Sequence, residues 1–111
     1  MERPKILVVD DEARMRKLVK DFLVKSNYEV LEAEDGSRAM DIFYEQKDIA
    51  LVILDIMMPK MDGYQTTEKI REIEQKTGNK SFIIGLTSNV YDSDKESCLA
   101  CGMNEFMSKP F

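Results

Sequence analysis

The stretch ALVILDIMMP, residues 50–59, decides the fold of this chain. Its first five residues are all apolar, and an apolar run bounded by a turn signal is typical of a strand buried on both faces of a parallel sheet. Asp55 follows the run directly. Because a charged group is costly inside an apolar core, Asp55 is expected where the strand leaves the core, at its carboxyl end. Open α/β sheets bind their ligands at that edge.

Four other segments favour strands. Residues 5–9 and 81–86 are apolar and rich in β-branched side chains, as buried strands are. Residues 28–33 alternate between apolar and polar side chains, which indicates a more exposed strand. Residues 104–107 predict a short last strand.

Amphipathic segments between these strands favour helices. The first begins after the acidic residues 10–12 and ends at Ser26; apolar residues recur along it at three- and four-residue intervals, namely Met15, Leu18, Val19, Phe22 and Leu23. The second follows a turn with capping residues at positions 34–37. The third covers residues 64 to about 75, and the residues expected on its outward face are Arg71, Glu72 and Glu74.

A fourth helix, at about residues 91–100, is weakly encoded because this segment contains poor helix formers. Five strands that alternate with helices predict a single α/β domain with a doubly wound parallel sheet. At 111 residues the chain is long enough to bury a core without a disulfide or a metal.

Composition excludes several classes of function. The net charge of −5 argues against a nucleic-acid-binding surface, because phosphates need clustered lysines and arginines. No apolar stretch is long enough to span a membrane, and the first residues do not form a signal peptide, so a cytoplasmic location is expected. The chain contains no histidine, which excludes Ser-His and Cys-His catalysis.

Cys98 and Cys101 are the two cysteines, and their spacing is that of a CxxC motif. Two thiolates without a histidine do not complete a tetrahedral zinc site. Redox CxxC motifs favour a helix N-terminus, whereas this pair precedes Gly102 at an expected helix C-terminus. Two half-buried thiols in a reducing compartment are therefore expected.

Chemically active side chains stand at four predicted strand ends, namely Asp10, Asp11, Asp55, Thr87 and Lys109. In a parallel sheet with right-handed crossovers these ends share one edge, so the five side chains are expected to converge. Carboxylates ~4 Å apart would repel by about 4 kcal/mol per pair at an effective dielectric constant near 20. An all-oxygen ligand set without histidine or cysteine selects a hard cation such as Mg²⁺.

Lys109 and Thr87 add two groups suited to a phosphoryl oxygen, an ammonium and a hydroxyl. A cation, a lysine and a carboxylate suit in-line attack by an aspartate on a phosphoryl group. This attack needs no general base, because carboxylates are ionised at neutral pH. Each of the five residues also has an ordinary structural role when taken singly, but their joint placement at one edge favours function.

Four parts of the sequence together resemble the receiver domain of two-component response regulators: residues 8–11, residues 54–63, Thr87 and residues 109–111. The resemblance covers essentially the whole chain and matches all five site positions in order. It implies one receiver domain over residues 1–111, with a flavodoxin-like sheet of order 2-1-3-4-5. It also implies a partner, either a histidine kinase or a histidine phosphotransfer protein, that donates the phosphoryl group.

The resemblance implies a role for each acidic residue. Asp55 would be the phosphoacceptor. Asp11, Asp55 and the backbone carbonyl of Met57 would ligate Mg²⁺, and Asp10 would position a bound water. Phosphorylation would change the surface of the fourth helix and fifth strand.

Thr87 and Lys109 would hold the phosphoryl oxygens, by the same resemblance. Phe106 falls where the family has its switch aromatic, thought to turn inward as Thr87 moves toward the phosphoryl group. Phenylalanine replaces the commoner tyrosine here and so lacks a phenolic hydroxyl. A core role for Phe106 is an equal alternative, because buried aromatic residues at strand ends are common.

Two other functions are also compatible with the sequence. A magnesium-dependent phosphatase with an aspartyl-phosphate intermediate would need a general acid two residues after Asp55, and that position is Met57. A docking module that is not phosphorylated would not need all five groups. The signalling module is the preferred interpretation, and beyond self-phosphorylation and self-dephosphorylation no enzyme activity is expected.

The resemblance also expects a fifth helix after Phe111, where the sequence stops. One helix is expected on one face of the sheet and the other three on the opposite face. The sparsely covered face would then be apolar, since the third and fourth strands are apolar on both sides. The chain is therefore expected either to be excised or truncated after the fifth strand, or to bind a second copy or a partner there.

Overall fold

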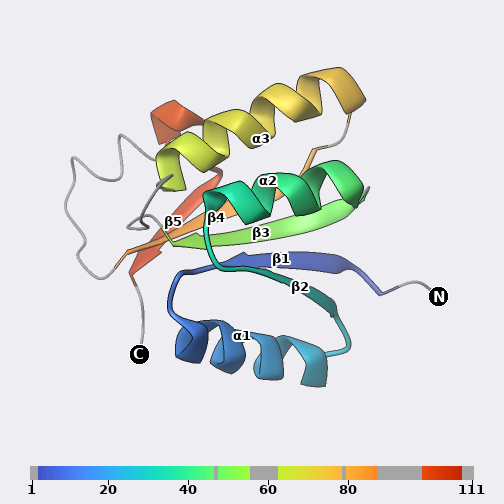
Figure 1. Ribbon diagram of the computed structural model, residues 1–111, viewed down its shortest axis with the longest axis vertical. Coiled ribbons are helices and arrows are strands. Elements are labelled where there is room, and N and C mark those ends of the chain that lie inside the picture. The colour runs from blue at the N-terminus through green and yellow to red at the C-terminus, as the bar shows by residue number, and fades with distance from the viewer. Residues whose placement is uncertain (1–2, 47, 56–62, 79, 88–98, 109–111) are drawn as a thin grey trace.

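The computed structural model describes residues 3–46, 48–55, 63–78, 80–87 and 99–108 (Figure 1). The elements follow in the order β1 (Lys5–Val9), α1 (Ala13–Lys25), β2 (Glu29–Ala33), α2 (Gly36–Glu45), β3 (Ile49–Asp55), α3 (Gly63–Thr77), β4 (Phe82–Thr87) and β5 (Glu105–Ser108). Residues 99–101 are also helical, whereas most of the weakly encoded fourth helix lies outside the described residues.

The five strands form one parallel sheet in the order β2-β1-β3-β4-β5. This confirms the order 2-1-3-4-5 and the doubly wound fold. Because every strand runs in the same direction, the carboxyl ends of all five lie at one edge, as predicted. Val9 pairs with Leu54, and Thr87 pairs with Ser108, so the strands carrying the predicted site residues are adjacent.

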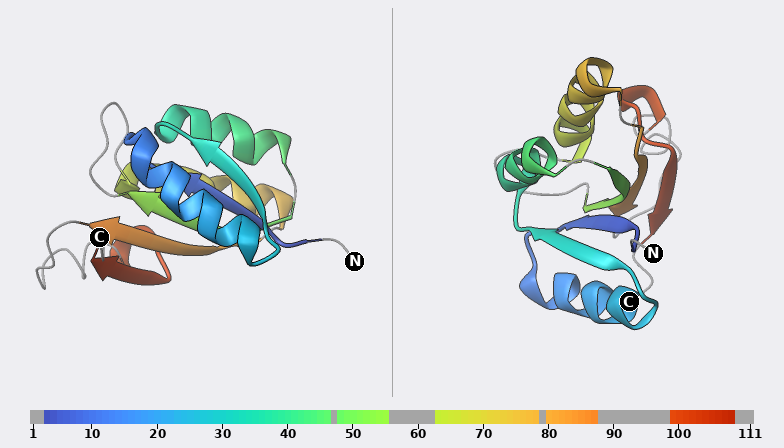
Figure 2. Two further views of the ribbon diagram at one scale, coloured as in Figure 1. Left: turned by 90° about the horizontal axis from the view of Figure 1, so that it is seen from below. Right: turned by 90° about the vertical axis from the view of Figure 1, so that its right-hand side faces the viewer.

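The main core lies between the sheet and the helices α2 and α3, which cover the same face (Figures 1 and 2). Alternate strand residues point into it, as the two-residue period of a strand requires. The strands supply Leu7, Val9, Val52, Leu54 and Ile83, and the helices supply Ala39, Ile42, Phe43, Ile70 and Ile73.

Helix α1 covers the opposite face, beside β1 and β2 (Figure 2). Ile6, Val8 and Met15 are buried on this side. The apolar stripe of α1 extends beyond the covered area, because Leu18 and Phe22 are 53% and 71% exposed. The sequence pattern thus predicted the helix correctly, but part of its apolar face meets no other described element.

The expectation that β3 is buried on both faces is only partly correct. Val52 and Leu54 are fully buried under α2 and α3, whereas Leu51 and Ile53 are half-buried and Ala50 is exposed. Leu51 and Ile53 alternate with Val52 and Leu54, so they face the α1 side, and α1 lies over β1 and β2 rather than over β3. Within the described residues, the α1 face is therefore the sparsely covered face that the sequence predicted.

One prediction about α3 is wrong. Glu74 was expected on the outward face, but its exposed fraction is only 7%. Its carboxylate accepts hydrogen bonds from the backbone N–H and the hydroxyl of Ser81, at 2.6 and 2.9 Å, and pairs with Arg71. These partners compensate its desolvation, so a charged residue occupies a buried position on the helix.

The helix boundaries follow local capping rules. The Asp35 carboxylate accepts a hydrogen bond from the Arg38 backbone N–H at 2.8 Å and so caps the start of α2, in the turn predicted to carry capping residues. Asn27, just after α1, has a φ of 70°, a conformation that asparagine tolerates better than most residues. No helix in the described part of the chain is both long and apolar enough to cross a membrane.

Candidate functional site

Three predicted carboxylates meet at the carboxyl edge of the sheet. Asp10 and Asp11 follow β1, and Asp55 ends β3. Because Val9 pairs with Leu54, the residues after β1 lie beside the end of β3. One carboxylate oxygen from each of the three residues lies within 4.8 Å of the other two. The sequence prediction that these acids converge is therefore correct.

The burial of this acidic cluster is uneven. Asp10 and Asp55 are each 4% exposed, whereas Asp11 is exposed to solvent. Two carboxylates 4.8 Å apart repel by about 3.5 kcal/mol at an effective dielectric constant near 20. Solvent screens the pairs that include Asp11 more strongly than the buried pair. The cluster can therefore relieve its repulsion by holding a cation.

The ligand set fits Mg²⁺. It consists of carboxylate oxygens only, and Mg²⁺ prefers one or two protein carboxylates together with waters and phosphate oxygens. Soft metals would prefer thiolates or imidazoles, and the chain has no histidine. The open side at Asp11 leaves room for waters or for a phosphoryl group.

Local hydrogen bonds fix Asp10. Its backbone N–H donates to the Ala33 carbonyl at 3.1 Å, and its Oδ1 accepts from the Glu12 backbone N–H at 2.9 Å. The Asp10 carbonyl accepts a hydrogen bond from Arg16 Nη1 at 2.6 Å. Arg16 Nε also lies 3.6 Å from a Glu32 carboxylate oxygen. The turn between β1 and α1 is thus held from β2 and from the first helix.

Sequence reasoning missed the role of Arg16. Its position on α1 belongs to the polar face, so the pattern indicated a solvated side chain. The available signal was its spacing: a helix residue six positions after Asp10 can reach back to the turn that precedes the helix. A long side chain with several donors suits that reach.

The remaining predicted site residues are described in part or not at all. Thr87 is the last residue of β4 and lies at the same sheet edge as Asp55; Phe106 lies on β5, where it pairs with Gly85. The side chains of Thr87 and Phe106 lie outside the described part of the structure, as do Met57 and Lys109 entirely. Lys109 directly follows Ser108, the partner of Thr87. The roles of these four residues stay predictions.

Cys101 belongs to the short helical segment before Gly102. Burial raises the pKa of its thiol, and the nearby Glu68 carboxylate adds to the rise. A raised pKa lowers the fraction of reactive thiolate, the opposite of what redox motifs need. This fits the prediction of a structural thiol; Cys98 lies outside the described residues.

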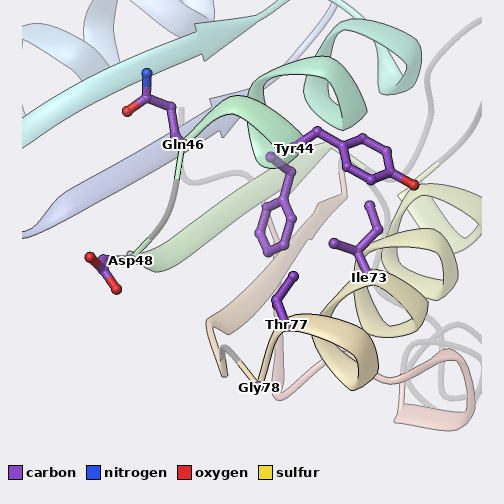
Figure 3. Close-up of a pocket in the computed structure, with 7 residues that line it drawn as sticks. Tyr44, Gln46, Asp48, Ile73, Thr77 and Gly78 are labelled. Atoms are coloured by element: carbon purple, nitrogen blue, oxygen red, sulfur yellow. The ribbon is translucent and has the colours of Figure 1, made fainter.

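A cavity of about 430 Å³ lies at the opposite edge of the sheet (Figure 3). It is lined by the last turns of α2 and α3 and by the turn before β3, through Phe43, Tyr44, Gln46, Asp48, Ile73, Thr77 and Gly78. The cavity lies before the first residue of β3 and Asp55 is its last, so the length of the strand, roughly 20 Å, separates them. The cavity is therefore not part of the acidic cluster.

The chain belongs to the family of response regulator receiver domains, whose family model matches residues 6–111. This agrees with the sheet order and with the acidic cluster at the carboxyl edge.

Two curated relatives represent two kinds of protein. The chain is 38% identical over 111 residues to a probable transcriptional regulator, ycf27, of Porphyridium aerugineum, covering 100% of this chain and 44% of the relative. It is 34% identical over 110 residues to hybrid signal transduction histidine kinase I of Dictyostelium discoideum, covering 96% of this chain and 6% of the relative. The chain therefore spans less than half the length of both relatives.

Solved structures agree in fold. The chemotaxis protein CheY4 of Vibrio cholerae superposes with a TM-score of 0.90 at 29% identity, covering 98% of this chain and 88% of that one. A co-crystal structure of the Saccharomyces cerevisiae histidine phosphotransfer signaling protein Ypd1 with the receiver domain of Ssk1 matches with a TM-score of 0.90 at 25% identity, covering 98% and 80%.

Proposed function

We propose that this receiver domain accepts a phosphoryl group on Asp55, from the phosphohistidine of a histidine kinase or a histidine phosphotransfer protein, in the presence of Mg²⁺. The observation that carries the proposal is the cluster of carboxylate oxygens from Asp10, Asp11 and Asp55 within 4.8 Å. The relatives support the partner class, because one is a hybrid histidine kinase and another structure pairs a receiver with a phosphotransfer protein.

In the proposed reaction, an Asp55 carboxylate oxygen forms a bond to phosphorus while the phosphorus–nitrogen bond of the phosphohistidine breaks. The released imidazole takes up a proton from water. Mg²⁺, when bound, neutralises charge on the carboxylates and the transferring phosphoryl group. Asp11 and Asp55, with the carbonyl of Met57, are the proposed ligands, and Asp10 is the proposed partner of a metal-bound water.

Two further residues complete the proposed site. Thr87 and Lys109 hold the oxygens of the phosphoryl group, one through a hydroxyl and one through an ammonium. The position of Thr87 supports its part, because it ends β4 beside the end of β3. Phe106 and Thr87 form the proposed switch that alters the surface of β5 and the preceding helix.

Incubation with a small phosphodonor and Mg²⁺, followed by intact mass measurement, tests this function. The expected result is a single phosphoryl adduct that Asp55→Asn abolishes. Asp41→Asn is the matched control, since it removes one carboxylate from an exposed position on α2 and should retain the adduct.

The same experiment separates the alternatives. Release of inorganic phosphate so fast that no adduct accumulates would indicate the phosphatase, and the absence of both adduct and phosphate release would indicate a docking module. Both outcomes would reject phosphoryl acceptance as the function. A signalling role in the cytoplasm, without turnover of a separate substrate, is part of the proposal.

A further inference from the structure

The pairing of β5 with β4 is not fixed by burial of Glu105 and Met107, whose side chains share one face of the strand. β5 has four residues and lies at the edge of the sheet. Glu105 is exposed and Met107 is 50% exposed. On that face no buried apolar side chain selects one register, and a slip by one residue turns every side chain to the opposite face.

Asn104, the residue before β5, supplies a register contact. Its backbone N–H donates to the Ile83 carbonyl at 2.9 Å, and its side-chain Oδ1 accepts from the Ile83 backbone N–H at 2.9 Å. Asn104 therefore engages both backbone groups of one residue on β4. In a slipped register a different residue would lie opposite Ile83, and it would need an acceptor at the same distance from the Ile83 N–H. The two bonds of Asn104 therefore favour a single register.

Arg71 of α3 holds Asn104 and the preceding turn. Its Nη2 donates to the same Oδ1 of Asn104 at 2.6 Å, and its Nε donates to the Gly102 carbonyl at 2.9 Å. The guanidinium fork has its donors in a fixed plane, so these two bonds fix the turn and the asparagine relative to each other.

The other side of the guanidinium is tied to the start of β4. Arg71 Nη1 donates to a Glu74 carboxylate oxygen at 2.6 Å and to the Ser81 carbonyl at 2.9 Å. The buried Glu74 in turn accepts from Ser81. Arg71 therefore joins α3, the start of β4 and the residue before β5 into one cluster.

Gly102 is fitted to this arrangement. Its φ is +110°, a conformation that side chains rarely adopt, and a Cβ atom built on it would lie 3.0 Å from Arg71 Cγ. The turn passes so close to the arginine stem that only glycine fits without a shift. This close approach lets the Gly102 carbonyl reach Arg71 Nε.

We propose that Arg71, acting through Asn104, is a positioning residue for Lys109, and this inference rests on the proposed function. The register fixed at Ile83 and Asn104 pairs Thr87 with Ser108 four residues later, and Lys109 follows Ser108. A slip of one residue displaces the chain by about 3.3 Å, far beyond the ~0.5 Å within which a site residue must be held. Arg71 acts from the opposite end of β5, roughly 15 Å from the phosphoryl site.

The test measures the rate of Asp55 phosphorylation by a small phosphodonor with Mg²⁺, in Arg71→Met and Asn104→Ala. Both variants are expected to be about tenfold to a hundredfold slower, since misplacing a reacting group by ~1 Å has effects of that size. Asn104→Asp keeps the acceptor and is expected to retain the wild-type rate. Lys69→Met, which removes an exposed cation from the same helix, is the matched control.

A double-mutant cycle with Lys109→Ala distinguishes positioning from a general loss of structure. If Arg71 acts by placing Lys109, Arg71→Met has no further effect on the rate once Lys109 is absent. Equal slowing in both backgrounds would overturn the inference, as would a wild-type rate in a folded Arg71→Met or Asn104→Ala protein. Should Arg71→Met not fold, the cycle is run with Asn104→Ala.

The proposed function and this inference fail in different ways. An adduct that persists in Asp55→Asn rejects phosphoryl acceptance at Asp55, whatever the cycle gives. An adduct that depends on Asp55 while the effects of Arg71→Met and Lys109→Ala simply add rejects only the positioning role.

Discussion

Replacing Asp10 by asparagine should make the metal-free protein more stable. Asp10 and Asp55 are both buried, and their carboxylate oxygens lie within 4.8 Å, so neutralising Asp10 removes a repulsion of about 3.5 kcal/mol at an effective dielectric constant near 20. Asparagine retains an oxygen that can accept the Glu12 N–H bond. Allowing roughly half for screening and relaxation, the free energy of unfolding should rise by about 2 kcal/mol.

Thermal unfolding followed by circular dichroism, with a chelator or with Mg²⁺, measures this effect. A gain of about 2 kcal/mol corresponds to a rise in Tm of roughly 8 °C or more for a domain of this size. Wild type should gain stability on adding Mg²⁺, because ligand binding to the folded state stabilises it. Asp10→Asn should gain much less, since the repulsion that the cation relieves is already reduced.

Asp41→Asn supplies the comparison, because it makes the same change of charge on an exposed surface of α2 and should leave Tm within a few degrees of wild type. Two results would refute the reasoning. One is a lower Tm for Asp10→Asn in the chelator. The other is a Mg²⁺ response of Asp10→Asn equal to that of wild type, which would separate the cation from these carboxylates.

Three other predictions concern the core, the thiol and the open face. Ile70→Ala should lower the free energy of unfolding by about 2–5 kcal/mol, and Phe22→Ala by less than about 1 kcal/mol, because Ile70 is fully buried and Phe22 is 71% exposed. Urea unfolding measures both losses, and losses of similar size would contradict the packing described above. In a Cys98→Ser background, Cys101 should react with iodoacetamide more slowly than a free thiol, since its pKa is raised. Its protonated form is favoured in the folded state, so stability relative to Cys101→Ser should fall as pH rises through the raised pKa; reaction at the free-thiol rate would refute this. Because the α1 face of the sheet is sparsely covered, we expect self-association or binding of a partner there. Sedimentation as a compact monomer with low binding of a hydrophobic dye would argue against this.

The sequence predicted the sheet well because its signals are local. Each buried strand is a short apolar run, and the residue that ends the run also reaches the functional edge. Asp55 shows this most clearly: a charge does not fit inside an apolar run, so the sequence placed it at the end of β3, where the structure has it, although its side chain is only 4% exposed there. The convergence of Asp10 and Asp11 with Asp55 then followed from parallel topology alone.

The cluster around Arg71 could not be predicted in the same way. A charged residue on a helix with an apolar stripe is expected outside, and the period of the pattern gives no reason to bury Glu74. Its carboxylate is held by Ser81 and by Arg71, and Arg71 is in turn bonded to the Gly102 carbonyl, which lies far away in the sequence. Side chains that depend on such tertiary partners carry no local signal.

The two edges of the sheet are therefore specified by different means. The carboxyl edge, which holds the acidic cluster, is set by the positions at which the apolar runs end. Each of its residues can therefore be predicted from the sequence of its own strand. The amino edge of β4 and β5 is set by the partly buried ion pair of Arg71 and Glu74 and by an asparagine that joins the two strands. Because β4 and β5 keep one register from the pairing of Ile84 with Glu105 to the pairing of Thr87 with Ser108, the second edge constrains the first. A receiver that keeps all its acidic residues would still misplace Lys109 if the cluster around Arg71 were lost. The identity of the five site residues alone therefore does not show whether Lys109 is correctly placed.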